Sequence, residues 1–397
     1  MCPYRAAGYI GCWRNSKTAV QTTEILVIGA GVIGNSIAYH LARQGRRVLV
    51  VDRADICAEP SASWASAGGI RRQGRHAAEV QLAIESIARW PTLGAELDAD
   101  LHYRSGGNLL LAEKDSEAER LARFVRAQHK KGFTDVRLVD RIEVQQRVPG
   151  VGSQVVAGSY SPADGQADSV STTRAFAAAA ERHGATYWLR TECDAILASE
   201  SRVIGARTSR GDVEAESVIL AAGALSNRIA ATVGISLPIH VEALQMIRST
   251  AAPTGSLVPV VSAIRRTLSL KQSHDGTFLL GGGWPGDITE DGRGYRLRPA
   301  SLEGNWNEAC AILPAVATQR VQHAWCGLEA MSADNIPFVG ALPAMRGLIV
   351  ATGFSGHGFA IAPAIGQALA DKLAGKPVPE LDGLRPDRIL SESVPTE

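Results

Sequence analysis

The stretch that most constrains this chain is residues 24–53, which reads EILVIGAGVIGNSIAYHLARQGRRVLVVDR. It contains, in order, an apolar run, three spaced glycines, an amphipathic segment and a second apolar run closed by an acid: residues 25–28, Gly29, Gly31 and Gly34, residues 35–45, residues 48–51 and Asp52. The pattern predicts a strand, a tight turn, a helix and a parallel strand.

The glycine spacing is typical of a dinucleotide site. Gly29 allows the tight turn, Gly31 lets a pyrophosphate approach the backbone, and Gly34 lets the helix pack closely on the strand. The helix N-terminus offers free N–H groups to the phosphates. Asp52 stands where an acid accepts hydrogen bonds from an adenosine ribose. This unit alone leaves NAD and FAD both open.

Length and charge narrow the class of protein. The 397 residues, 45% of them hydrophobic, can form about two domains with large cores. The 41 basic and 40 acidic residues form no long run of either sign, so no nucleic-acid partner is expected. No apolar run approaches the ~18 residues of a membrane span. The six cysteines show no metal-ligand spacing, which favours a reducing, cytoplasmic location and no metal.

Small residues recur at several distant places. Residues 61–69 would let the backbone lie close to a flat ligand, with Arg71 and Arg72 placing positive charge beside it. A buried strand at residues 218–221 ends in Ala222 and Gly223. Near the C-terminus a strand at residues 348–351 precedes a glycine-rich turn and a helix expected from about residue 363 to 373.

The changes of pattern along the chain predict an α/β fold. A Rossmann-like dinucleotide-binding domain is interleaved with an α+β substrate domain built on a mostly antiparallel sheet. The predicted cofactor domain comprises residues 24–98, 148–228 and 336–385, and the substrate or partner domain comprises 99–147 and 229–335. Residues 1–23 are expected to be an extension and residues 386–397 a tail.

Four stretches together resemble the D-amino acid oxidase and sarcosine oxidase family of FAD-dependent oxidoreductases. They are VIGAGVIG with Asp52, VILAAGA at residues 218–224, WCGLEAMSADNIPFVG at residues 325–340 and ATGFSGHGF at residues 351–359. They follow one another in the family's order and span most of the chain after residue 23. The loop ASAGGIRRQ most resembles β subunits of heteromeric sarcosine oxidase, D-hydroxyproline dehydrogenase and opine oxidase.

The resemblance implies FAD rather than NAD, because the later motifs are those with which the family surrounds its flavin. Non-covalent FAD is expected, since the loop at residues 63–69 has no histidine and Cys326 falls one place from the family's tethering cysteine. The residues expected to contact FAD are Gly29, Gly31, Val32, Ile33, Gly34, Asp52, Arg53, Ser61, Ser66, Ala67, Gly68, Gly69, Cys193, Ala222, Gly223, Gly327, Gly353, Gly356, His357, Gly358 and Phe359.

The resemblance also implies oxidation of the CH–NH bond of a secondary amine or of an N-substituted or cyclic amino acid, by hydride transfer to flavin N5. The chain departs from family positions that bind a substrate carboxylate at Ala360 and Glu329, so Arg71 or Arg72 is expected to replace them. The remaining candidate catalytic residues are His357, Glu329 and Lys271, although a lysine on a strand is more often exposed.

Several functions stay open at this point. The favoured interpretation is a catalytic β-type subunit of a heteromeric dehydrogenase, with partner subunits that carry a further redox centre. A self-sufficient amine or D-amino acid oxidase that releases hydrogen peroxide is the near alternative. A subunit in which FAD is only structural, and an NAD-dependent dehydrogenase, are further alternatives.

Overall fold

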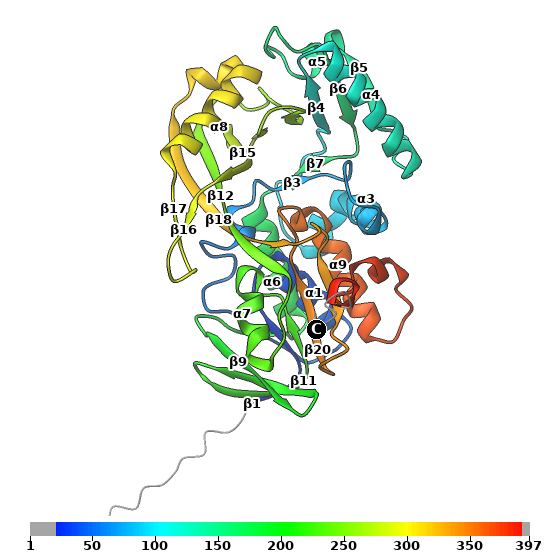
Figure 1. Ribbon diagram of the computed structural model, residues 1–397, viewed down its shortest axis with the longest axis vertical. Helices are drawn as coiled ribbons and strands as arrows, with labels where there is room; N and C mark the ends of the chain where they lie inside the picture. The colour runs from blue at the N-terminus through cyan, green and yellow to red at the C-terminus, as the bar shows by residue number, and fades with distance from the viewer. Residues whose placement is uncertain (1–20, 391–397) are drawn as a thin grey trace, which may run out of the picture.

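The computed structural model of the chain describes residues 21–390, and two sheets organise it (Figure 1). Most of the predicted N-terminal extension therefore lies outside the described residues, and residues 21–23 already belong to the first strand. Of the predicted tail, residues 391–397 lie outside the described part, whereas Asp387–Leu390 form the short helix α10.

The first sheet, in the lower half of Figure 1, is the predicted dinucleotide-binding sheet. Its strands run in the order β19-β20-β11-β1-β2-β8. Their bounds are Phe338–Ala341, Leu348–Thr352, Gly211–Leu220, Gln21–Ile28, Val48–Val51 and Thr186–Trp188, with β9 (Cys193–Ser199) and β10 (Arg202–Thr208) joined to β11. All neighbours from β20 to β8 pair in parallel, as expected when helices connect the strands.

Both faces of this sheet are buried. Ile25 and Val27 of β1 point into a core formed with helices α1 (Val32–Arg43), α3 (Val80–Leu97), α6 (Ser169–Arg182) and α9 (Gly358–Leu373). Leu26 and Ile28 point to the opposite core, which the β9 and β10 layer covers. Burial on both faces explains why β1 reads as a continuous apolar run.

The second sheet, in the upper half of Figure 1, is mostly antiparallel. Its strands run in the order β18-β12-β15-β14-β13-β4-β6-β5. Their bounds are Val321–Ser332, Ile239–Ala251, Thr277–Pro285, Ser269–Gln272, Val260–Ala263, Asn108–Ala112, Ala157–Ser161 and Arg137–Asp140. Helix α8 (Pro299–Ile312) supplies Ala309 and Ile312 to its core, and α4 (Asp115–Lys130) and α5 (Arg141–Arg147) flank β4–β6. The predicted fold class is confirmed.

Two predicted boundaries are wrong. The strand β6 pairs with β4 and β5, so residues 157–161 belong to the second sheet although the cofactor domain was predicted to resume at residue 148. Helix α9 begins at Gly358 and not near Pro363, which lies inside it. Ser86 Oγ and Trp90 Nε1 both donate to the Ala360 carbonyl, at 2.7 and 3.0 Å, and these tertiary bonds hold the first turns.

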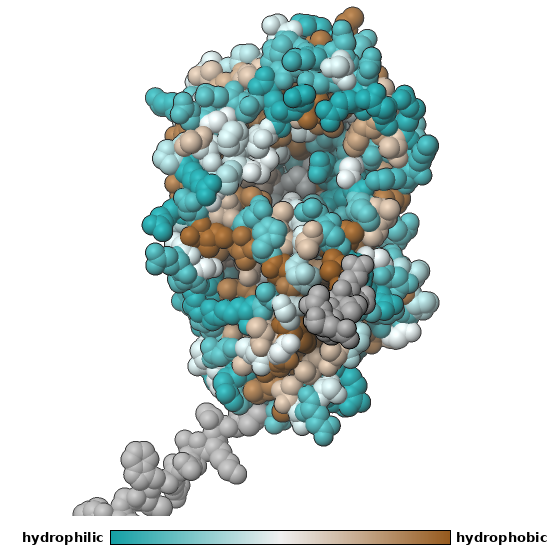
Figure 2. Space-filling model, in the orientation of Figure 1, coloured by the Kyte–Doolittle hydropathy of each residue, from teal (hydrophilic) through white to brown (hydrophobic). Residues whose placement is uncertain are grey.

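The surface shown in Figure 2 is mainly hydrophilic, with hydrophobic residues in small separate patches. Among residues 21–390 no helix is both long and apolar enough to cross a membrane. The same residues contain no group of three or more histidine, cysteine, aspartate or glutamate side chains suited to a metal ion.

Candidate functional site

A cavity of about 660 Å³ lies between the two sheets. The residues that follow β1, β2, β11 and β20 line one side, and residues of β12 and β18 line the other. Ligands of open α/β sheets bind outside the carboxyl ends of the parallel strands. The cavity therefore occupies the position that the fold favours for a ligand.

Most of the predicted site residues meet in this cavity. Those that line it are Gly29, Gly31, Val32, Ile33, Asp52, Arg53, Ser61, Ser66, Ala67, Gly69, Arg71, Cys193, Ala222, Gly223, Gly327, Glu329, Gly353, Gly356, His357, Gly358 and Phe359. Four predicted residues do not line it: Gly34, Gly68, Arg72 and Lys271.

The glycine turn after β1 has the conformation that a dinucleotide site needs. Gly29 has φ +115°, and a Cβ there would lie 2.3 Å from the Ala221 carbonyl oxygen. A Cβ on Gly34 would lie 1.9 Å from the Gly29 carbonyl oxygen, so Gly34 serves the packing of α1 on the turn and stays out of the cavity. The N-terminal turn of α1 therefore opens directly into the cavity.

Asp52, directly after β2, lines the cavity with its carboxylate held by two backbone N–H groups. Its Oδ2 accepts a hydrogen bond from the Ala30 N–H at 2.7 Å, and its Oδ1 accepts one from the Ala54 N–H at 2.8 Å. Burial raises the pKa of Asp52, and the two N–H donors oppose that rise. Each oxygen keeps a lone pair that can accept from a hydroxyl in the cavity.

The loop of small residues packs against β18. The short helix α2 (Ala62–Ala65) starts at Ser61, and a Cβ on Gly327 would lie 2.4 Å from the Ala65 Cβ. Ser63, which the sequence analysis missed, accepts a hydrogen bond from the Val32 N–H at 2.9 Å. Its hydroxyl thus lies at the N-terminus of α1, where the pyrophosphate of a dinucleotide is expected.

The glycine-rich turn before α9 forms another wall. Gly353, Ser355 and Gly356 all have positive φ values, of +73°, +51° and +78°. A Cβ on Gly358 would lie 2.8 Å from the Phe354 side chain, so only glycine fits there without a shift. The turn directs the N-terminus of the 16-residue helix α9 at the cavity, where its dipole favours negative charge.

The two candidate arginines lie in different surroundings. Arg71 lines the cavity, whereas the Arg72 guanidinium pairs with Asp135 and lies 5.3 Å from the centre of the Phe133 ring. The prediction that Arg72 serves the site is therefore wrong, because its side chain is held by residues of the loop after α4. Arg71 remains the candidate for an anionic group.

Glu329 brings a carboxylate to the same cavity from β18. Burial raises the pKa of Glu329 to about 7, although the Gly356 N–H lowers it. Glu242 of β12, missed by the sequence analysis, is its cross-strand partner and also lines the cavity. The site thus combines Arg71 with a carboxylate that changes charge near neutral pH.

Lys271 lies behind the loop of small residues. It is 4% exposed and lines a second cavity of about 290 Å³ together with Ser66 and Ala67. Its Nζ donates to the Ala167 carbonyl at 3.4 Å, and a Cβ on Gly68 would lie 3.2 Å from that Nζ. Burial lowers the pKa of Lys271 to about 7. The lysine is therefore buried, and the loop separates it from the main cavity.

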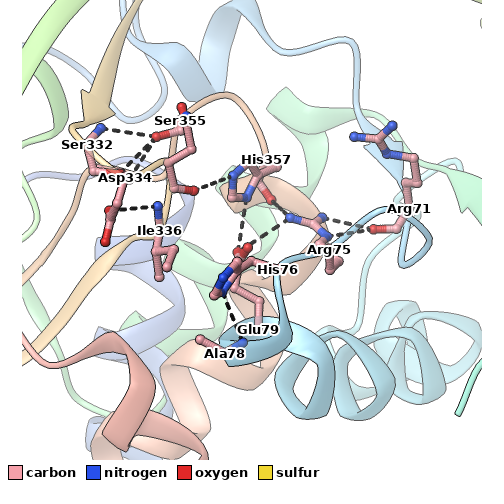
Figure 3. A network of polar contacts seen from close by, with 12 residues as sticks. Arg71, Arg75, His76, Ala78, Glu79, Ser332, Asp334, Ile336, Ser355 and His357 are labelled. Atoms are coloured by element: carbon pink, nitrogen blue, oxygen red, sulfur yellow. Dashed lines mark hydrogen bonds and ion pairs between the residues drawn. The ribbon is translucent and has the colours of Figure 1, made fainter. Parts of the chain in front are cut away.

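A buried polar network joins His357 to residues that the sequence analysis did not select (Figure 3). Arg75 is 4% exposed and lines the cavity, and Glu79 is 1% exposed. In the sequence, Arg75 could have been marked as a site residue only by being a third basic residue after Arg71 and Arg72.

Glu192 and Arg228, near the predicted Cys193 and Gly223, also line the cavity and form an ion pair of 2.9 Å.

These residues fit FAD. The turn at Gly29 leaves room only for backbone, the Asp52 carboxylate faces the cavity, and the N-termini of α1 and α9 both open into it. One cavity thus offers places for a ribose, a pyrophosphate and a ring that gains negative charge.

Comparisons with known proteins agree with this geometry. The family model described as "FAD dependent oxidoreductase" matches residues 24–372. The chain is 26% identical to a glycine oxidase of Bacillus licheniformis, over 89% of this chain and 94% of that protein. It is 27% identical to one subunit of the opine oxidase of Agrobacterium tumefaciens strain Ach5, over 79% of this chain and 84% of that protein.

A solved structure, the L-proline dehydrogenase from P. horikoshii, superposes with a TM-score of 0.86 at 28% identity, over 95% of this chain and 100% of that one. The predicted resemblance to the D-amino acid oxidase and sarcosine oxidase group is confirmed. The chain belongs to the DAO family, and it is an FAD-dependent oxidoreductase.

Proposed function

We propose that this chain oxidises the CH–NH bond of a secondary amine or of an N-substituted or cyclic amino acid, such as sarcosine, D-hydroxyproline or an opine. The observation that carries the proposal is that Arg71 and Glu329 line the same cavity. A guanidinium suits a substrate carboxylate, and a carboxylate suits a cationic nitrogen. An amino acid presents both groups.

The chemistry requires the nitrogen to lose its proton before the neighbouring carbon gives up a hydride. Glu329 suits the first step, because its pKa of about 7 lets it hold that proton near neutral pH. FAD, when bound, would supply at its N5 the acceptor for the hydride, which carries both electrons of the oxidation. The product is an imine, which stays cyclic or reacts with water to give a carbonyl compound and an amine.

The remaining residues position and shield the reacting groups. The N–H groups at the start of α9 favour the negative charge that develops in the cavity during the reaction. His357 lines the cavity, but Nε2 of its ring lies 3.3 Å from the Asn335 carbonyl and Nδ1 lies 3.1 Å from Glu79. Both nitrogens therefore face protein acceptors, which favours an electrostatic role over proton exchange with the substrate.

We further propose that the chain is the catalytic β-type subunit of a heteromeric dehydrogenase, whose partner subunits carry a further redox centre. The similarity to the opine oxidase chain, which is itself one subunit of its enzyme, supports this arrangement. FAD is expected to be bound without a covalent link, and the protein is expected to be cytoplasmic.

The test is anaerobic reduction of the purified yellow protein. Sarcosine, hydroxyproline or an opine is expected to bleach the flavin absorbance, and acid is expected to release the colour. A flavin that stays oxidised with every secondary amine tried would refute the substrate class. An unreactive flavin beside an active companion subunit would indicate a structural role for FAD in this chain.

A self-sufficient oxidase that releases hydrogen peroxide is the second candidate, and the similarity to glycine oxidases favours it. Lys271, buried behind residues 66–69, would assist the reaction of the reduced cofactor with oxygen in that case. Rapid reoxidation by air without any partner protein would favour the oxidase, and slow reoxidation would favour the heteromeric dehydrogenase.

A further inference from the structure

Arg75 connects two walls of the cavity. Its Nε and Nη2 donate to the Arg71 carbonyl at 3.0 and 2.9 Å, and its Nη1 donates to the His357 carbonyl at 3.1 Å (Figure 3). Lys131 at the end of α4 donates to the carbonyl of Arg75 itself at 2.6 Å. Burial lowers the pKa of Arg75 only to about 10, so the guanidinium stays charged at neutral pH.

Glu79 places one oxygen between the Arg75 guanidinium and the His357 ring. Its Oε1 lies 3.7 Å from Arg75 Nη1 and 3.1 Å from His357 Nδ1. Oε1 makes no hydrogen bond with either group, so the carboxylate acts on both through its charge. A buried carboxylate needs such partners, because an unpaired charge is costly away from water.

Both nitrogens of the His357 ring face acceptors of the protein. Nε2 lies 3.3 Å from the Asn335 carbonyl and Nδ1 lies 3.1 Å from the Glu79 carboxylate. Glu79 therefore orients the ring. The ring is held beside the N-terminus of α9, where His357 is the capping residue.

The turn that holds His357 needs such an anchor, because glycines flank it on both sides. On the side of β18 the turn is fixed by Ser355, whose Oγ lies 3.2 Å from Ser332 Oγ. On the side of α3 the described contacts come from Arg75 and Glu79.

We propose that Arg75 and Glu79 are positioning residues that fix the His357 turn and the Arg71 backbone against each other, and so set how the N-terminus of α9 is presented to the reduced flavin. The inference depends on FAD at the start of α9, as in the proposed function, but not on the identity of the amine.

The test measures the midpoint potential of the FAD holoenzyme by dye-equilibrated reduction, without any amine substrate. In Glu79→Gln the His357 turn, which directs the N-terminus of α9 at the cavity, loses part of its support, and reduced FAD is expected to bind about tenfold less well relative to oxidised FAD. For a two-electron couple this is a fall of ~30 mV. If Glu79 acted only by its own charge through space, removing that charge would instead raise the potential.

Three further variants make the test specific. Arg75→Lys keeps the charge but cannot reach both carbonyls, so the potential is expected to fall as well. His357→Asn is expected to lower it, and the double variant with Glu79→Gln is expected to fall no further than the larger single effect. Glu143→Gln removes a glutamate that pairs with an arginine four residues on in α5, away from the cavity, and is the matched control.

The proposal is supported if the midpoint potential falls in all three single variants, falls non-additively in the double variant, and stays unchanged in Glu143→Gln. A rise in Glu79→Gln, additive effects, or unchanged potentials in folded variants would overturn it. If the variants at Arg75 and Glu79 do not fold, Lys131→Met removes only the outer bond to Arg75, and a smaller fall is expected. No fall in that variant would then refute the proposal. Failure of amine oxidation alone leaves these potentials unaffected, so the two proposals fail separately.

Discussion

Replacing Lys271 by methionine is expected to stabilise the protein, and more so in mild acid than in mild base. Lys271 is 4% exposed, and burial lowers its pKa from 10.5 to about 7. A lowered pKa means that folding opposes protonation, so the stability of the wild type falls as the pH falls from 10.5 to 7. Below pH 7 the loss is complete.

The size of the effect follows from the shift. At ~1.4 kcal/mol per pKa unit, a gap of about 3.5 units corresponds to about 5 kcal/mol at about pH 6. At about pH 9 the folded lysine is neutral, and the remaining loss is about 2 kcal/mol. Methionine has a similar length and no charge, so the stability gain of Lys271→Met should shrink by about 3 kcal/mol between these pH values.

The assay is urea unfolding of wild type and Lys271→Met at both pH values, with FAD in excess. Lys130→Met, at the exposed end of α4, is the control and should change stability little at either pH. A gain that is equal at the two pH values, or larger in base, would refute the burial argument for Lys271.

Three other predictions concern the site. Gly29→Ala should abolish FAD binding, measured by flavin fluorescence, because its Cβ would lie 2.3 Å from the Ala221 carbonyl oxygen; a yellow variant would contradict this. Asp52→Asn should weaken FAD binding by about 10- to 100-fold, as for a lost hydrogen bond to a charged group, whereas Asp212→Asn, an exposed aspartate in β11, should not. In the wild type KM should fall as the pH rises through about 7, the pKa of Glu329, and steady-state kinetics of Glu329→Gln should lose that step; a step that persists would place it elsewhere.

The parts of the site that could be predicted from sequence are those whose cause is local. Gly34 is required by a backbone contact within the turn and its helix, and Gly29 by the positive φ of that turn, so both requirements leave a fixed spacing in the sequence. Gly68 reflects a close approach of backbone, since a Cβ there would lie 1.9 Å from the Ala167 carbonyl oxygen. The small residues Ser66, Ala67, Gly69, Gly356 and Gly358 of the same motifs line one cavity.

The parts that could not be predicted depend on contacts between distant residues. Nothing in the sequence distinguishes Arg71 from Arg72, because Phe133 and Asp135, which hold Arg72, approach it only in the fold. Arg75 meets His357 across 282 residues of sequence. The start of helix α9 was predicted too far along the chain, near Pro363, because proline is common at helix starts. The hydrogen bonds from Ser86 and Trp90 that allow the earlier start are tertiary contacts.

Substrate specificity and FAD binding depend on different parts of the site. The backbone turns that suit FAD depend on glycine conformations, whereas Arg71 and Glu329 present their side chains to the cavity, Glu329 while accepting from the Gly356 N–H. Relatives at 26–28% identity accordingly include a glycine oxidase, one chain of an opine oxidase and an L-proline dehydrogenase. Substrate choice in this chain should therefore change with substitutions at Arg71 and Glu329 that leave FAD affinity within a few-fold of wild type. A variant such as Glu329→Gln that lost both FAD binding and substrate binding would show that substrate choice and FAD binding are not separable in this chain.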